Sequence, residues 1–101
     1  FVPAEIAVSY ARGGAACLGR QGQIGELSIG AAADLVVWPL DGVRYAGAWS
    51  DPVEALFRCG PGSPKYTVIN GRVVVDNGEL VATGVEDILT RHEAVARRWQ
   101  A

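Results

Sequence analysis

Apolar residues recur at helical spacing near both ends of the chain. Residues 3–18 carry Ile6, Tyr10 and Cys17 on one side, which predicts a helix that begins with proline and ends at Gly19. Gly13 and Gly14 inside this run should each cost about 1 kcal/mol relative to alanine. We therefore expect another backbone to pack closely against this glycine pair.

The last helix is predicted from Thr83 to about Trp99, within a segment 83–101. Thr83 and Glu86 have the spacing of a capping box, which predicts the start of the helix at this point. One stripe at 3.6-residue spacing holds most of the apolar residues: Val85, Ile88, Leu89, His92, Val95, Ala96 and Trp99.

The middle of the chain alternates short apolar runs with turn residues. Residues 35–38 predict a strand buried on both faces, and the glycines before it shape turns. Residues 67–69 and 72–75 flank Asn70-Gly71, a strong hairpin signal. The turn at 76–78 leads into a further short strand, so we expect a β-meander.

A short helix is predicted at residues 51–59, between the first strand and the hairpin. Asp51 can cap it, Pro52 suits its first position, and Glu54 completes a capping box. Gly60-Pro61 should end it. The fold class expected from all these elements is α+β.

Composition bounds the kind of protein. The 101 residues suffice for one small domain, half of them are apolar, a fifth are charged, and the net charge is −2. The basic residues are scattered apart from Arg97-Arg98, which argues against a nucleic-acid partner. The longest apolar run, 35–40, is too short to cross a membrane.

The start of the chain and its cysteines indicate a compartment. No basic-then-apolar leader is visible, so we expect no secretion signal and a cytoplasmic location. Cys17 and Cys59 form no metal or redox motif, and we expect two reduced, buried thiols, with a disulfide as the alternative. The chain begins Phe-Val-Pro without methionine, which indicates processing, incomplete numbering or a piece of a longer polypeptide.

The residues that could carry chemistry are few and dispersed. His92 is the one histidine and lies on the apolar stripe, so we expect a packed or half-exposed core residue rather than a ligand. A nucleophile pair of Cys17 or Cys59 with His92 has no support from spacing. Asp34 is expected to bond to nearby turn amides.

The aromatic residues allow two interpretations. Trp38, Tyr45 and Trp49 could line a pocket, but in so small a chain they are expected in the core or at an interface. From the residues alone we therefore predict no catalytic, cofactor-binding or metal-binding residue in this chain.

Four segments nevertheless resemble a known family. These are "ARGGAACLGR", "IGELSIGAAADLVVWPL", "DPVEALFRCG" and "YTVINGRVVVDNGEL". In this order they resemble the carboxyl-terminal end of the amidohydrolase superfamily, in the branch of metal-dependent deaminases and chlorohydrolases. Residues 44–61, "RYAGAWSDPVEALFRCGP", are most similar to the 8-oxoguanine deaminases.

The resemblance implies a domain organisation. Residues 1–19 would be the last helix of an upstream TIM barrel, and residues 22–82 would supply the carboxyl-terminal strands of a composite β-sandwich, with the short helix 51–59. Residues 83–101 would be a closing helix. The metal ligands of the family would lie upstream of Phe1, and no position in this chain matches them.

The resemblance also implies a reaction for the intact enzyme. A divalent metal, zinc or iron, would activate water to attack a ring carbon of a purine-like substrate, and ammonia would leave. The partners implied are the upstream barrel, the small-molecule substrate and, in many members, further copies of the protein as a homo-oligomer. The alternatives are a self-standing β-rich interaction module without activity and a small enzyme that uses Cys17 or Cys59.

Overall fold

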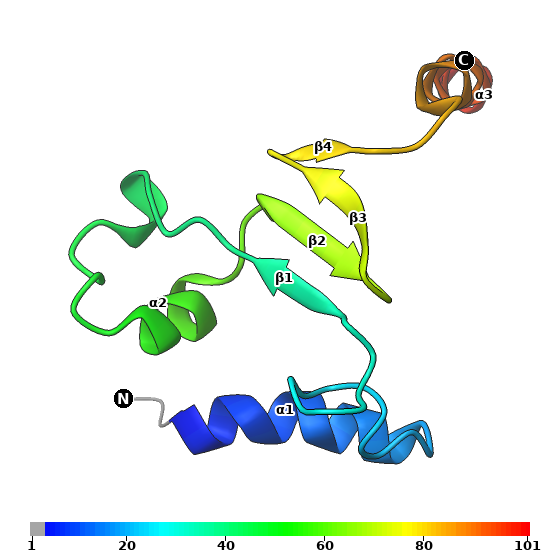
Figure 1. Ribbon diagram of the computed structural model, residues 1–101. Coiled ribbons are helices and arrows are strands. Elements are labelled where there is room, and N and C mark those ends of the chain that lie inside the picture. The colour runs from blue at the N-terminus through cyan, green and yellow to red at the C-terminus, as the bar shows by residue number, and fades with distance from the viewer. Residues whose placement is uncertain (1–3) are drawn as a thin grey trace.

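The computed structural model describes residues 4–101, which form a small antiparallel sheet with helices arranged around it (Figure 1). The predicted position of Pro3 at the start of the first helix lies outside the described residues. Mixed helix and sheet agree with the expected α+β class. The elements in chain order are α1 (Ala4–Cys17), β1 (Leu35–Val37), the 3₁₀ turn η1 (Val43–Tyr45), α2 (Pro52–Cys59), β2 (Tyr66–Ile69), β3 (Arg72–Asp76), β4 (Glu79–Leu80) and α3 (Val85–Gln100).

The sheet is a meander with strand order β1-β2-β3-β4, every neighbouring pair antiparallel. The predicted hairpin between β2 and β3 is confirmed, because Asn70 has φ 51° and Gly71 has φ 78°. Asn77 and Gly78 repeat this geometry between β3 and β4, with φ 50° and 84°. These are the left-handed conformations that asparagine and glycine adopt most easily, so local sequence specifies both turns.

The first strand differs from its prediction. β1 ends at Val37, all three of its residues are exposed, and among residues 4–101 it pairs only with β2, at the edge of the sheet. The prediction of a strand buried on both faces was therefore wrong for this chain. A β-branched apolar run indicates that burial of the strand is favourable. Whether it is buried depends on other elements of the tertiary structure that cover its faces.

The end of α1 is set by Gly19, which has φ 69° as predicted for a left-handed helix end. Close backbone packing occurs at Gly25 instead of at Gly13-Gly14. A Cβ at Gly25 would lie 2.5 Å from the Ala11 carbonyl oxygen, whereas a Cβ at Gly13 or Gly14 would meet nothing within 4 Å. The expectation about the glycine pair was therefore wrong for this chain, because the loop after α1 folds back over Ala11.

The short helix α2 forms as predicted. Asp51 is its N-cap and accepts a hydrogen bond from the Glu54 amide at 3.0 Å, with Pro52 in the first turn. Glu54 and Arg58 form an ion pair at 2.8 Å one turn apart, and the helix ends before Gly60. This element is specified by its own capping residues.

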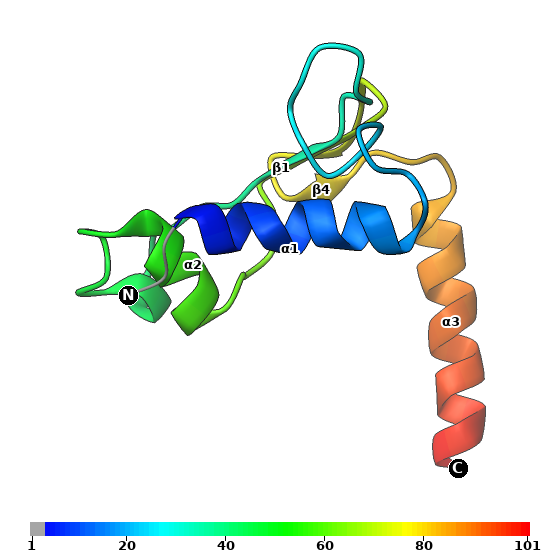
Figure 2. The same ribbon diagram turned by 90° about the horizontal axis from the view of Figure 1, so that it is seen from below.

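The last helix begins later than its predicted capping box. Its N-cap is Gly84 in a left-handed conformation, φ 80°, and no side chain caps the helix, so the role predicted for Thr83 was wrong. α3 has no buried residue, and Figure 2 shows it running away from the sheet. His92 is exposed on it, which contradicts the predicted core position. Gly84 takes the N-cap position in place of Thr83, and α3 has no buried residue, so His92 has no core to lie in.

The chain is open rather than compact. The buried apolar residues within 4–101 are Ala15, Tyr45 and Ala55. The radius of gyration is 17.3 Å, against about 13 Å for a compact domain of this length. The accessible surface is 7917 Å², against about 5,500 Å² for a folded monomer of this mass.

Candidate functional site

The described residues bring no reactive cluster together. Within residues 4–101 no group of three histidine, cysteine, aspartate or glutamate side chains could hold a metal ion. His92 lies on the projecting helix α3, whereas Cys17 ends α1 and Cys59 ends α2. A divalent metal therefore finds no fitting set of donors in this part of the chain.

Both cysteines are free thiols. Cys59 is half-buried, but Cys17 is exposed, so the expectation of two buried thiols was wrong for Cys17. Cys17 is the last residue of α1, where the helix surface lies open. Neither thiol has a hydrogen-bonded base among the contacts of the described residues, which leaves the nucleophile hypothesis without geometric support.

Asp34 acts as predicted, as an acceptor for a turn amide. Its Oδ1 accepts a hydrogen bond from the Asn70 amide at 2.6 Å. The neighbouring Ala33 carbonyl accepts one from the Gly71 amide at 2.9 Å. The two bonds tie the start of β1 to the β2–β3 turn, so this carboxylate has a structural role.

A polar cluster surrounds Tyr45. The buried Tyr45 hydroxyl donates to the Gly60 carbonyl at 2.8 Å and accepts from the Gly62 amide at 3.2 Å. Arg44 donates from Nη1 to the Pro61 carbonyl at 3.1 Å. This cluster fixes the loop after α2 and is internal to the fold. Sequence reasoning missed it, because no spacing signal links residues 44–45 to residues 60–62.

The other two candidate aromatics are not gathered with Tyr45 into a pocket. Trp49 is exposed, and its indole N–H donates to the Leu40 carbonyl, whereas Trp38 is half-buried. Tyr10 of α1 instead meets Phe57 of α2, with ring centroids 5.4 Å apart. Tyr45 is thus buried, as expected for a core position, whereas a core position was wrong for the exposed Trp49, and an interface position for Trp38 and Trp49 stays a prediction.

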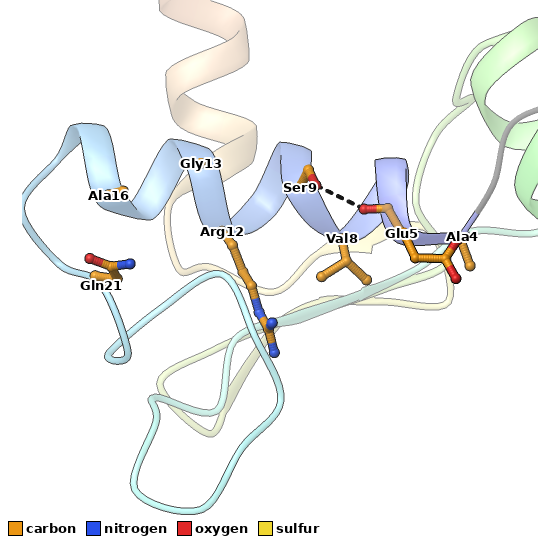
Figure 3. Close-up of a pocket in the computed structure, with 8 residues that line it drawn as sticks. All are labelled: Ala4, Glu5, Val8, Ser9, Arg12, Gly13, Ala16 and Gln21. Atoms are coloured by element: carbon orange, nitrogen blue, oxygen red, sulfur yellow. Dashed lines mark hydrogen bonds between the residues drawn. The ribbon is translucent and has the colours of Figure 1, made fainter.

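An open groove runs along α1 (Figure 3). Ser9 in its wall donates to the Glu5 carbonyl at 2.9 Å, and Arg12 forms an ion pair with Glu26 at 3.7 Å. These interactions bind the helix to itself and to the loop that follows it. The groove lacks a nucleophile paired with a base, and its lining is mostly small or aliphatic: Ala4, Glu5, Val8, Ser9, Arg12, Gly13, Ala16 and Gln21.

Comparison with known proteins assigns the chain to a family. Residues 1–74 match the model of the amidohydrolase family. The chain belongs to this family. The superfamily resemblance of the four sequence segments is thereby confirmed.

Curated relatives of this amidohydrolase chain include deaminases. It is 31% identical over 97 residues to a 5-methylthioadenosine/S-adenosylhomocysteine deaminase of Syntrophobacter fumaroxidans, covering 95% of this chain and 22% of the relative. It is 36% identical over 93 residues to an 8-oxoguanine deaminase of Pseudomonas aeruginosa, and this match covers 91% of this chain and 20% of the relative. The chain thus spans about a fifth of the length of the curated relatives it matches.

The solved structure of a chlorohydrolase is similar in fold to this chain. The atrazine chlorohydrolase of Arthrobacter aurescens TC1, in complex with zinc, matches with a TM-score of 0.67 and 38% identity, over 83% of this chain and 18% of that one. Most of this amidohydrolase chain is therefore similar in fold to a segment of that chlorohydrolase. Among residues 4–101, no helix has both the length and the apolar character needed to span a membrane.

Proposed function

We propose that this chain is the carboxyl-terminal structural segment of a metal-dependent amidohydrolase that deaminates a purine-like base. Residues 1–19 would be the last helix of a TIM barrel, 22–82 the carboxyl-terminal strands of a composite β-sandwich, and 83–101 a closing helix. The observation that carries the proposal is the length match, because the chain aligns almost entirely with about a fifth of each deaminase relative.

The surface of the chain supports this proposal. Apolar side chains are exposed on both the sheet and α3, including Val36, Ile69 and Trp99. Exposed apolar patches and an edge strand such as β1 are features that a larger assembly covers. The accessible surface exceeds that of a compact monomer by about 2,400 Å².

The catalytic chemistry would belong to the rest of the polypeptide. The amidohydrolase relative from Arthrobacter aurescens was solved with zinc, and a divalent metal such as zinc or iron is the cofactor we propose for the intact enzyme. Residues 4–101 offer no group of three ligands for this metal. The segment would therefore contribute by packing against the rest of the polypeptide. The 8-oxoguanine-type substrate rests on the likeness of residues 44–61, and the 8-oxoguanine deaminase of Pseudomonas aeruginosa supports it.

Assays of the longer polypeptide test the proposal. We expect it to hold a divalent metal, measured by inductively coupled plasma mass spectrometry, and to release ammonia from 8-oxoguanine faster than from 5-methylthioadenosine or chloride from atrazine. The 101-residue chain should bind no metal and release nothing. Stoichiometric metal and turnover in the 101-residue chain alone would contradict the segment assignment, and triazine dechlorination without ammonia release would overturn the substrate class.

Substitutions within the segment separate this proposal from a small cysteine enzyme. In the longer polypeptide, Cys17→Ser and Cys59→Ser should leave the kcat of deamination unchanged, because no thiol takes part. Loss of kcat in either variant, at unchanged metal content and unfolding midpoint, would favour the cysteine enzyme instead.

A further inference from the structure

The two asparagine–glycine turns of the sheet are sites of chemical reactivity. Asparagine is among the thermolabile residues, and it deamidates fastest before glycine, because no side chain then hinders the backbone nitrogen that attacks it. Asn70 precedes Gly71, Asn77 precedes Gly78, and both asparagines are exposed. A Cβ at either glycine would meet nothing within 4 Å, so both turns have space for the cyclic imide that forms during deamidation.

The reaction needs no partner other than water. The Gly71 amide loses its proton to solvent, and its nitrogen attacks Cγ of Asn70. A C–N bond forms, the bond from Cγ to Nδ2 breaks, and Nδ2 takes up a proton and leaves as ammonia. Water then opens the cyclic imide at one of its two carbonyl carbons, which gives aspartate or isoaspartate. The net change is one water consumed and one ammonia released.

Hydrogen bonds of the two glycine amides oppose this reaction in the folded chain. The Gly71 amide donates to the Ala33 carbonyl at 2.9 Å, and the Gly78 amide donates to the Lys65 carbonyl at 2.9 Å. An amide that donates such a bond keeps its proton, and its nitrogen cannot attack a side chain. Deamidation at either turn therefore requires that the bond first opens by local unfolding.

The two amides are held by different parts of the sheet. Lys65 directly precedes β2, which is paired with β1 on one side and with β3 on the other. Ala33 lies just before β1, a three-residue strand with exposed residues that, among residues 4–101, pairs only with β2. Figure 1 shows the β2–β3 turn and the start of β1 at the same end of the sheet. The bond that protects Asn70 thus depends on an exposed edge strand.

Asp34 strengthens the protection of Asn70 in two ways. Its Oδ1 accepts a hydrogen bond from the Asn70 amide at 2.6 Å, which holds the turn against the start of β1. Its negative charge also lies beside the turn, where it opposes formation of an amide anion at Gly71. Removal of this carboxylate therefore makes both opening of the turn and attack by the nitrogen more favourable.

We propose that Asn70 is a site of spontaneous deamidation whose rate is set by the contact of the β2–β3 turn with residues 33–34. Isoaspartate at this position adds one atom to the main chain and a negative charge to the turn, so the modified turn no longer fits the start of β1. The contact that stabilises the hairpin thereby also determines how long the unmodified hairpin lasts. This inference concerns chemical ageing of the fold and does not rest on the deaminase activity.

Incubation of the longest natural polypeptide that contains this chain, at mildly alkaline pH, tests the proposal. Peptide mapping by mass spectrometry measures the conversion of each asparagine to aspartate and isoaspartate. Asn70 should deamidate in the unsubstituted protein, and Asp34→Ala should speed this reaction about fivefold, because the Gly71 amide then opens more often. Asn77 is the internal control, and its rate should be the same in both proteins, because the Gly78 amide keeps its bond to Lys65.

A second variant and an unfolded reference make the test specific. Asp34→Asn removes the charge but keeps an acceptor oxygen, so Asn70 should deamidate at a rate between those of the unsubstituted protein and Asp34→Ala. Equal acceleration at Asn70 and Asn77 in Asp34→Ala would indicate general loosening of the fold and would overturn local control by residues 33–34. An Asn70 that stays intact in every folded variant, yet deamidates in the same polypeptide unfolded in urea, would overturn its assignment as a site.

Discussion

Asp34 and Asn70 lie 36 positions apart in the chain and are joined by a hydrogen bond of 2.6 Å from the Asn70 amide to the Asp34 carboxylate. Asn70 is the first residue of the β2–β3 turn, and Asp34 precedes β1. A residue outside the hairpin thus satisfies a backbone donor of the turn. This contact connects the part of the fold that local sequence specifies to the part that it does not.

Removal of the Asp34 carboxylate should loosen the turn. In Asp34→Ala the Asn70 amide loses its acceptor at an exposed site, which should cost about 1 kcal/mol and speed amide exchange of Asn70 about fivefold. Asp34→Asn keeps an acceptor oxygen, so its Asn70 amide should exchange at a rate between those of the unsubstituted protein and Asp34→Ala. Unchanged Asn70 exchange in Asp34→Ala, measured by hydrogen–deuterium exchange, would contradict this role.

The glycine that matters for packing near α1 should be Gly25. Gly25→Ala places a Cβ 2.5 Å from the Ala11 carbonyl oxygen at φ +81°, and should lower the free energy of unfolding by about 2 kcal/mol or more. Gly14→Ala is the control, because its Cβ meets nothing within 4 Å, and it should raise stability by up to about 1 kcal/mol. Urea denaturation of the longer polypeptide that contains this chain, followed by circular dichroism, measures both. The reverse ranking would show that the close contact is elsewhere.

The Tyr45 hydroxyl should stabilise the loop after α2. Tyr45→Phe retains the ring but leaves the Gly60 carbonyl and the Gly62 amide without their shared partner, at a cost of about 1–2 kcal/mol. Arg44→Ala removes only an exposed hydrogen bond to Pro61 and should cost less than about 0.5 kcal/mol. Thermal unfolding measures the stability of both variants. If the two substitutions lowered stability equally, the Tyr45 hydroxyl would not be what fixes the loop after α2.

The two thiols should differ in reactivity. Without reductant, iodoacetamide should add twice to the 101-residue chain, since both cysteines are free, and Cys17 should react first because it is exposed while Cys59 is half-buried. Mass spectrometry of timed samples reports the order, and Cys17→Ser should remove the fast phase alone. A chain that adds no label until it is reduced would instead contain the disulfide.

The local elements of this fold could be predicted because each contains its own signal. Asn70-Gly71 and Asn77-Gly78 supply the left-handed conformations that two-residue turns require, and Asp51 with Glu54 supplies the cap of α2. Such signals act over a few residues, so the residues themselves are enough to place the element. The family could also be identified at this level, since the order of four segments sufficed.

Burial and long-range contact were decided by tertiary structure. The apolar run 35–38 and the stripe of α3 both predict burial, yet β1 is an exposed edge and α3 has no buried residue. Periodicity identifies which side of an element is apolar but does not say what covers it. Gly25 against Ala11, and Tyr45 against residues 60–62, join positions 14 to 17 residues apart through the path of a loop. That path depends on the packing of whole elements, and no local pattern encodes it.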